Sequence, residues 1–330
     1  MANYNVLTLS EPVADFVATT SPEAINVQCS LTEDAQRKRV WAVCKAGGIP
    51  AHPYDGVRVL MTGDSLVTAM ISGLTNDTEY GVRLFVEGKF GYQTALEGAT
   101  AAATPRAGQP ATVFPVGTVL AIPMADGSAQ RRIVVHQGLP SSMYDTSCNG
   151  TWTLEEENHE SRQWHSTNVN NYKLSTIHSW LNGGYAALFN VHFLAKVVEA
   201  KIPYVNGTGG SEVASGANGL PCKFFLLGGY EVGFSKSVDS AFPTDGAKLE
   251  FFLSGTSAAA NNKRMISGYW WLRSPDTTNS SGARRVSTYG QADSVICSLS
   301  GCGARPACII PSDTLFSLEP NTDGSYSPIL

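Results

Sequence analysis

The sequence predicts an all-β sandwich at the N-terminus, followed by a larger α+β unit. Short apolar runs separated by turn residues fill the N-terminal third. A proline-bounded stretch of small residues at 99–110 is then typical of a linker. A hairpin pattern, two helical patterns and further strand-like runs follow in that order. A chain of 330 residues has the length of two domains, which we place at residues 1–106 and 107–330.

The N-terminal strands are expected at residues 40–43, 57–61 and 80–86, where apolar residues alternate or cluster. Turn-forming groups such as Thr62-Gly63-Asp64 separate them. Alternate side chains of a strand point to the same side, so the last strand has one apolar face. These features predict a small β-sandwich.

The second unit begins with a predicted hairpin, in which residues 116–122 and 132–135 flank the turn signal Asp126-Gly127-Ser128. Two helices are predicted from apolar residues at helical spacing. Gly183-Gly184 is expected to end the first helix, and Pro203 lies beyond the second. Strands are expected at residues 222–227 and 249–253. The apolar positions are Leu174, Ile177, Trp180 and Leu181 in the first helix, and Leu188, Val191, Leu194 and Val198 in the second.

The composition excludes several function classes. A net charge of -5 with only 15% charged residues argues against a protein that binds the nucleic-acid backbone, which needs a dense basic patch. No apolar run of about 18 residues exists, so we expect no membrane insertion. The first residues, Met1 to Asn5, lack the basic and apolar regions of a secretory signal, and we expect none.

The cysteine and histidine positions predict no metal or cofactor. The seven cysteines are scattered without a CxxC pair, and we expect reduced, buried thiols, with a Cys302–Cys308 disulfide as the alternative. His159 and His165 lie near four glutamates in the sequence, a pattern that suits a metal site, an acid–base pair or a solvated polar loop. We favour the polar loop.

Two motifs near the C-terminus enclose a polar insert. The first is Trp-Trp-Leu-Arg-Ser-Pro at residues 270–275, and the second is Gly-Ala-Arg-Pro-Ala at 303–307. We expect one of Trp270 and Trp271 to pack inward and the other to line the rim, and Arg273 and Arg305 to hydrogen-bond within the protein rather than to a ligand. The insert is rich in Ser, Thr, Asn, Asp and Tyr, which make adaptable contacts in binding loops.

Residues 20–103 resemble a fibronectin type III domain. The resemblance lies in the segments 48–50, 55–57, 73–75 and 78–83. In that family a Leu precedes a Tyr by six residues, as Leu74 precedes Tyr80 here. The resemblance implies a tyrosine corner, in which the Tyr80 hydroxyl bonds back to the preceding loop. Such a domain implies a spacer or docking role.

Residues 112–313 resemble a bacterial and phage domain family with a C-type lectin-like fold. The segments that carry the resemblance occur in order at 144–148, 179–182, 201–204, 229–233, 270–275 and 303–307. Such domains occur in variable proteins that are diversified by retroelements, and in phage tail or receptor-binding proteins. The resemblance implies a fixed fold that displays a variable patch.

The predicted function is therefore that of a non-enzymatic adhesin of a phage virion or prophage, located on the virion. We expect a host cell-surface protein or glycan as its ligand, other tail proteins as partners, and a homo-oligomer. Alternatives are an enzyme of the formylglycine-generating type, using Cys297 and Cys302, and a virion decoration protein without a ligand. The predicted ligand-binding residues are Tyr269, Asp276, Thr277, Thr278, Asn279, Ser280, Arg284, Ser287, Thr288, Tyr289, Gln291, Asp293 and Ser294.

Overall fold

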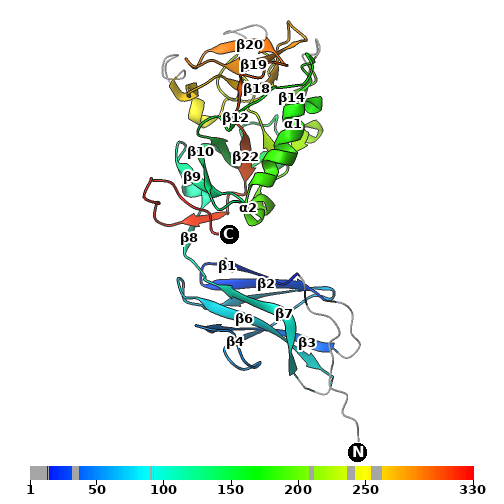
Figure 1. Ribbon diagram of the computed structural model, residues 1–330, viewed down its shortest axis with the longest axis vertical. Coiled ribbons are helices and arrows are strands. Elements are labelled where there is room, and N and C mark those ends of the chain that lie inside the picture. The colour runs from blue at the N-terminus through cyan, green and yellow to red at the C-terminus, as the bar shows by residue number, and fades with distance from the viewer. Residues whose placement is uncertain are drawn as a thin grey trace, which may run out of the picture. The chain divides into compact units, whose positions relative to one another are not determined.

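A computed structural model describes residues 13, 15–31, 37–89, 91, 93–207, 212–235, 242–253 and 262–330. The first residues, on which the expectation about a secretory signal depends, lie outside this part. The chain is predominantly β and forms two compact units (Figure 1). The first unit comprises Met1–Gly108 with Ile329–Leu330, and the second comprises Gln109–Pro328. The boundary predicted from the sequence lies between residues 106 and 107, two residues before the boundary in the structure.

The first unit contains two antiparallel sheets, which confirms that the N-terminal region is all-β. Apolar side chains from both sheets, such as Ile25, Val27, Val82 and Leu84, form one buried cluster. Alternation along each strand places these residues inward. One sheet has the order β1 (Val17–Ser21), β2 (Ala24–Ser30), β5 (Leu66–Ser72), and the other has the order β4 (Val57–Leu60), β3 (Arg37–Ala46), β6 (Tyr80–Gly88), β7 (Gln93–Ala103).

The predicted hydrogen bond of Tyr80 is confirmed. Its hydroxyl accepts a hydrogen bond from the backbone N–H of Thr75 at 3.0 Å. Leu74 beside it is buried in the core of the first unit. The hydroxyl thus satisfies a backbone donor at the point where the chain enters β6.

The second unit contains two five-stranded sheets and three short ladders. Residues at its two ends pair with each other, since β8 (Gly108–Pro110) lies beside β23 (Leu315–Ser317). The first large sheet has the order β17 (Phe224–Phe225), β22 (Ala307–Ile310), β11 (Gly150–Glu155), β10 (Ala129–Gly138), β9 (Val119–Pro123). The second has the order β12 (Glu160–Ser161), β21 (Gly303–Ala304), β18 (Trp270–Pro275), β19 (Gly282–Val286), β20 (Ala292–Ile296). The other ladders are β13 (Ala200–Ile202) with β16 (Leu220–Cys222), and β14 (Tyr204–Val205) with β15 (Val213–Ala214).

Both predicted helices exist, but they are shorter than the apolar pattern suggested. They are α1 (Thr176–Trp180) and α2 (Val191–Lys196). Side chains cap their first turns: Ser175 Oγ accepts from the N–H of His178 at 3.1 Å, and Asn190 Oδ1 accepts from that of His192 at 2.9 Å.

Gly183-Gly184 does not end the first helix, contrary to the prediction. The helical turns continue as a π-helical turn, η4 (Leu181–Tyr185), and as a 3-10 turn, η5 (Ala186–Leu188). A Cβ on Gly184 would lie 3.2 Å from the Trp180 indole, so the glycine makes room for that ring. The predicted strand at 249–253 is also wrong, because these residues contain the 3-10 turn η7 (Glu250–Phe252). Further 3-10 turns are η1 (Ala111–Val113), η2 (Thr146–Cys148), η3 (Tyr172–Leu174) and η6 (Gly216–Asn218).

Buried tryptophans dominate the interior of the second unit. Trp152, Trp164, Trp270 and Trp271 are all fully buried, so the expectation that one tryptophan of the motif lines a rim is wrong. The Trp271 indole N–H donates to the carbonyl of Arg162 at 2.8 Å, which fixes the ring inside. All seven cysteines are free and buried, as predicted, so the alternative of a Cys302–Cys308 disulfide is not realised.

Candidate functional site

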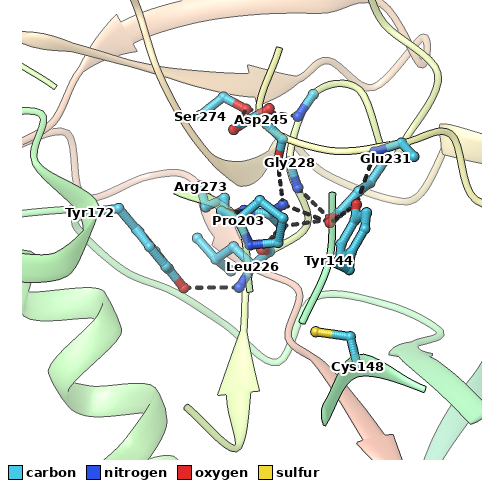
Figure 2. A network of polar contacts seen from close by, with 12 residues as sticks. Tyr144, Cys148, Tyr172, Pro203, Leu226, Gly228, Glu231, Asp245, Arg273 and Ser274 are labelled. Carbon is cyan, nitrogen blue, oxygen red and sulfur yellow. Dashed lines mark hydrogen bonds and ion pairs between the residues drawn. The ribbon is translucent and has the colours of Figure 1, made fainter. Parts of the chain in front are cut away.

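A buried ion pair anchors the Trp-Trp-Leu-Arg-Ser-Pro strand, β18. Arg273 and Glu231 form two parallel hydrogen bonds, Nη1 to Oε2 at 2.5 Å and Nη2 to Oε1 at 2.6 Å (Figure 2). Both side chains are fully excluded from solvent. Bidentate contacts of this kind fix geometry as well as adding energy. The pair therefore holds β18 against the loop that contains Glu231.

Arg273 also joins three further segments to β18. It donates to the carbonyl oxygens of Pro203 at 2.7 Å, Leu226 at 3.1 Å and Asp245 at 2.7 Å (Figure 2). Glu231 in turn accepts from the Tyr144 hydroxyl at 2.8 Å and from its own loop. One guanidinium group thus ties together segments that are distant in the sequence.

Asp245 extends the network to the next residue of the motif. Its Oδ2 accepts from Ser274 Oγ at 2.6 Å, and Ser274 Oγ accepts from the N–H of Gly229 at 2.7 Å. Asp245 is fully buried and its Oδ1 has no hydrogen-bond partner in the described part of the chain. Burial raises the pKa of this carboxyl to about 6.

Arg305 anchors the second motif to β11 and the loop after it. Its Nε donates to the carbonyl of Glu155 at 2.8 Å and its Nη2 to that of Glu156 at 2.9 Å. The guanidinium lies 5.0 Å from the ring centre of Trp270. Both motif arginines therefore hydrogen-bond within the protein, as the sequence predicted. We call Arg273, Glu231, Asp245 and Arg305, together with their hydrogen-bond partners, the frame.

The loop between β18 and β19 is fixed from behind by Asn170. This fully buried amide donates to the carbonyls of Asp276 at 3.0 Å, Asn279 at 3.1 Å and Gly282 at 2.9 Å. Within the loop, Asp276 Oδ1 accepts from the N–H of Thr278 at 2.9 Å. The backbone of residues 276–282 is thereby held in one conformation, while several of its side chains point outward.

The turn between β19 and β20 is closed in a similar way. Ser287 Oγ accepts from the N–H groups of Tyr289 at 3.3 Å and Gln291 at 3.1 Å. Arg264 Nε donates to the carbonyl of Gly290 at 2.7 Å. Gly290 has a φ of 70°, which favours glycine at this position of the turn. Tyr289 lies at the tip of the turn, where 70% of its surface is exposed.

The structure divides the predicted ligand-binding residues into three groups. Thr278, Asn279, Ser280, Tyr289 and Gln291 are exposed, and we call these five residues the polar face. Tyr269, Thr277, Thr288, Asp293 and Ser294 are partly buried. Asp276, Arg284 and Ser287 are buried, with 7%, 3% and 8% of their surface exposed. Ten of the thirteen predicted positions are thus exposed or partly exposed.

The buried group corrects the expectation that all thirteen residues are displayed. Asp276 Oδ2 accepts from Ser294 Oγ at 2.7 Å and lies 4.0 Å from Arg284 Nε. The Arg284 guanidinium stands over the ring of Phe242 at 4.4 Å. Ser287 closes its own turn as described above. These three side chains support the backbone of the loops rather than facing a ligand.

Arg285 lies outside the thirteen predicted positions, although as an arginine of the insert it is a candidate anchor, and it contacts two of them. Its guanidinium stacks over the Tyr269 ring at 4.1 Å, and its Nη2 lies 2.7 Å from Asp293 Oδ2. Arg285 and Asp293 are direct partners across β19 and β20. Opposite charges eight residues apart, on either side of a turn that contains Gly290, were the signal that could have identified the contact.

The expectation that His159 belongs to a solvated polar loop is also corrected, because its ring pairs with a buried carboxylate. His159 Nδ1 lies 3.3 Å from Oε1 of Glu155, which is fully buried. The Tyr185 hydroxyl donates to the same oxygen at 2.6 Å. Hydrogen bonding to Glu155 raises the pKa of His159. Within the described residues, no group of three or more His, Cys, Asp or Glu is placed to hold a metal ion.

The two cysteines of the enzymatic alternative lie inside the second unit, where the Cys302 thiol is close to the Arg285 guanidinium. Cys297 and Cys302 are fully buried, and burial raises the pKa of each thiol to about 12. A catalytic cysteine normally has a lowered pKa, because the thiolate is the reactive form. The environment of this pair therefore gives no support to thiolate chemistry.

One family model matches part of the second unit. Residues 149–312 match a family described as a domain of unknown function, DUF6273. The matched range begins one residue before β11 and includes the polar face and the four charged residues of the frame, Glu231, Asp245, Arg273 and Arg305. No curated protein matches the chain. Across the described ranges, every helix is too short or too polar to cross a membrane.

Proposed function

We propose that this chain is a binding protein whose second unit presents the polar face to a host cell-surface protein or glycan. The observation that carries the proposal is the contrast between a fixed backbone and outward side chains. Asn170 and Ser287 hold the two loops from the inside, while Tyr289 and its neighbours extend into solvent. Binding through loops that are already ordered avoids much of the entropy cost of association.

The chemistry of the polar face suits adaptable recognition. It combines one exposed tyrosine with hydroxyl and amide groups, a set that gives contact area and hydrogen bonds at low ordering cost. The stacked pair of Tyr269 and Arg285 borders it and adds the two residue types that are frequent at binding hot spots.

We propose further that the second unit has a C-type lectin-like fold and the first a fibronectin type III-like fold. The C-type lectin-like fold is supported by the paired terminal strands, the two helices and the sheet that contains β18. The fibronectin type III-like fold is supported by the three-stranded and four-stranded sheets and by the Tyr80 hydrogen bond. In this proposal the chain belongs to a phage virion or prophage, where the first unit docks to a tail protein. Several copies on one particle, as in a homo-oligomer, would strengthen weak single contacts through multivalency.

The experiment compares two fourfold alanine variants of the full chain. One carries Thr278→Ala, Asn279→Ala, Tyr289→Ala and Gln291→Ala on the polar face. The matched control carries Lys173→Ala, Thr176→Ala, Glu319→Ala and Thr322→Ala, all exposed positions of the second unit.

The readout is retention on bacterial cells and on an immobilised glycan panel. We expect the polar-face variant to lose binding and the control to keep it, with the same thermal unfolding temperature for both. Equal binding by the two variants would contradict the proposed site. Absence of binding by the unmodified chain to every cell type and glycan would favour a decoration protein instead.

A further inference from the structure

A second candidate site lies on the first large sheet of the second unit. An open pocket of about 590 Å³ is lined by residues 124–131 at the turn between β9 and β10, by the loop at 156–159 and by the end of η5. Its size falls within the range of pockets that hold a small molecule. Its lining residues belong neither to the polar face nor to the frame side chains.

One wall of the pocket is apolar and the other is acidic. Met124 and Leu188 line the apolar wall, and Asp126, Glu156 and Glu157 provide carboxylates. Arg131 is the single lysine or arginine among the lining residues, and it is shared between Glu156 in the pocket and Asp323 outside it. The charge inside the pocket is therefore negative on balance.

Each of the three carboxylates keeps one oxygen for a ligand. Asp126 uses Oδ1 to accept from Ser128 at 2.6 Å. Glu156 uses Oε2 for Arg131 at 2.5 Å, and Glu157 uses Oε2 for Ser267 Oγ at 2.9 Å. Hydrogen bonds through one oxygen hold each carboxylate in place, so its second oxygen is available without a large change of conformation.

His159 completes the polar wall, and its ring orientation is fixed from behind. Glu155 engages Nδ1, which leaves Nε2 as the ring nitrogen for contact with a ligand. Glu155 itself is positioned by Tyr185, whose hydroxyl also accepts from Arg132 Nη1 at 2.9 Å. His159 thus lines the pocket beside the acidic residues, and the buried Glu155 lies behind it.

We propose that this pocket binds a small organic cation, namely an ammonium group on a short aliphatic chain. The ammonium group lies among Asp126, Glu156 and Glu157, and the aliphatic part packs on Met124 and Leu188. The apolar wall of Met124 and Leu188 suits the alkyl chain of an organic cation, whereas a metal ion needs oxygen ligands on most sides.

Binding of a cation at this place depends on the charge of His159. The groups that act on the imidazole are Glu155 on β11, Glu160 on β12 and Arg132 on β10, together with the Tyr185 hydroxyl on η4. A protonated imidazole repels a cationic ligand, so affinity rises as pH rises through the pKa of His159. The ligand in turn lowers that pKa.

The test follows the imidazole resonances of the full chain by proton NMR while n-butylamine is added. The chain has 6 histidines, and the spectrum of His159→Gln identifies the resonance of His159. We expect n-butylamine to shift that resonance saturably, with tighter binding at about pH 8 than at about pH 6. Neutral n-butanol and anionic butyrate should leave it unchanged.

Two variants and one peptide complete the test. Glu157→Gln is expected to weaken n-butylamine binding about two- to fivefold, whereas Glu319→Gln, at an exposed site elsewhere in the second unit, leaves it unchanged. Equal shifts with n-butanol, or full affinity in Glu157→Gln with the other histidine resonances unaltered, would overturn the proposal. Binding of Nα-acetyl-lysine amide without binding of n-butylamine would also overturn it, because the ligand would then be a protein side chain.

Discussion

Removing the guanidinium of Arg273 gives the sharpest test of the frame. In Arg273→Met the Glu231 carboxylate stays fully buried but loses its ionic partner. The carbonyls of Pro203, Leu226 and Asp245 lose their donor at the same time. Methionine fills much of the same volume, so the change tests charge and hydrogen bonding more than packing.

The expected cost is about 3–5 kcal/mol of unfolding free energy, which is the usual range when one partner of a buried ion pair is removed. The double variant Arg273→Met/Glu231→Leu should recover part of this loss, because it no longer buries an uncompensated charge. A matched surface variant, Arg162→Met, breaks the exposed pair with Glu160. We expect it to cost about 1 kcal/mol or less.

Urea unfolding followed by tryptophan fluorescence measures this free energy in the second unit. Of the 6 tryptophans, only Trp41 lies in the first unit. The signal therefore reports mainly on the unit that contains Arg273. If Arg273→Met costs no more than Arg162→Met, the buried network does not hold the frame, and our reasoning about β18 is refuted.

Two further predictions concern the pH dependence of stability and the loop clamp, which is the set of three hydrogen bonds from the Asn170 amide to the loop at 276–282. Because the pKa of Asp245 is raised to about 6, the folded state keeps a proton that the unfolded state has lost above its ordinary pKa of 3.8. The unfolding free energy of the wild type, relative to that of Asp245→Asn, should therefore fall by up to about 3 kcal/mol as pH rises from about 4 to about 7. Urea unfolding at several pH values measures this difference. A difference that does not change with pH would contradict the prediction. Asn170→Ala should cost about 3 kcal/mol and accelerate hydrogen exchange at the Thr278 and Ser281 amides, whereas unchanged exchange would show that other contacts fix the loop.

Much of the fold could be predicted because its signals are local. Alternating or clustered apolar residues identified three strands of the first unit, β3, β4 and β6, and the spacing from Leu74 to Tyr80 predicted the hydrogen bond that the hydroxyl makes. The burial of Arg273 and Arg305 could also be anticipated, since each lies within an apolar motif. In the 249–253 segment, however, an apolar run in a 3-10 turn has the same composition as a buried strand.

The details of the candidate site depended on contacts between distant segments. Asp276 and Ser287 are typical surface residues in composition, yet each is buried because it satisfies backbone donors of its own turn. The pairing of Glu155 with His159 is buried by Tyr185 and Arg132, which no local pattern connects to them. Long-range packing of this kind decided which polar residues face solvent.

The clamp by Asn170 has a consequence for how the loop at 276–282 can change over generations. The amide nitrogen donates to main-chain oxygens there, and every amino acid supplies such an oxygen. Substitutions at Thr278 and Ser280 can therefore accumulate while these hydrogen bonds persist. Under the proposed function, a lineage could change its ligand by altering a few codons, without having to evolve a new architecture.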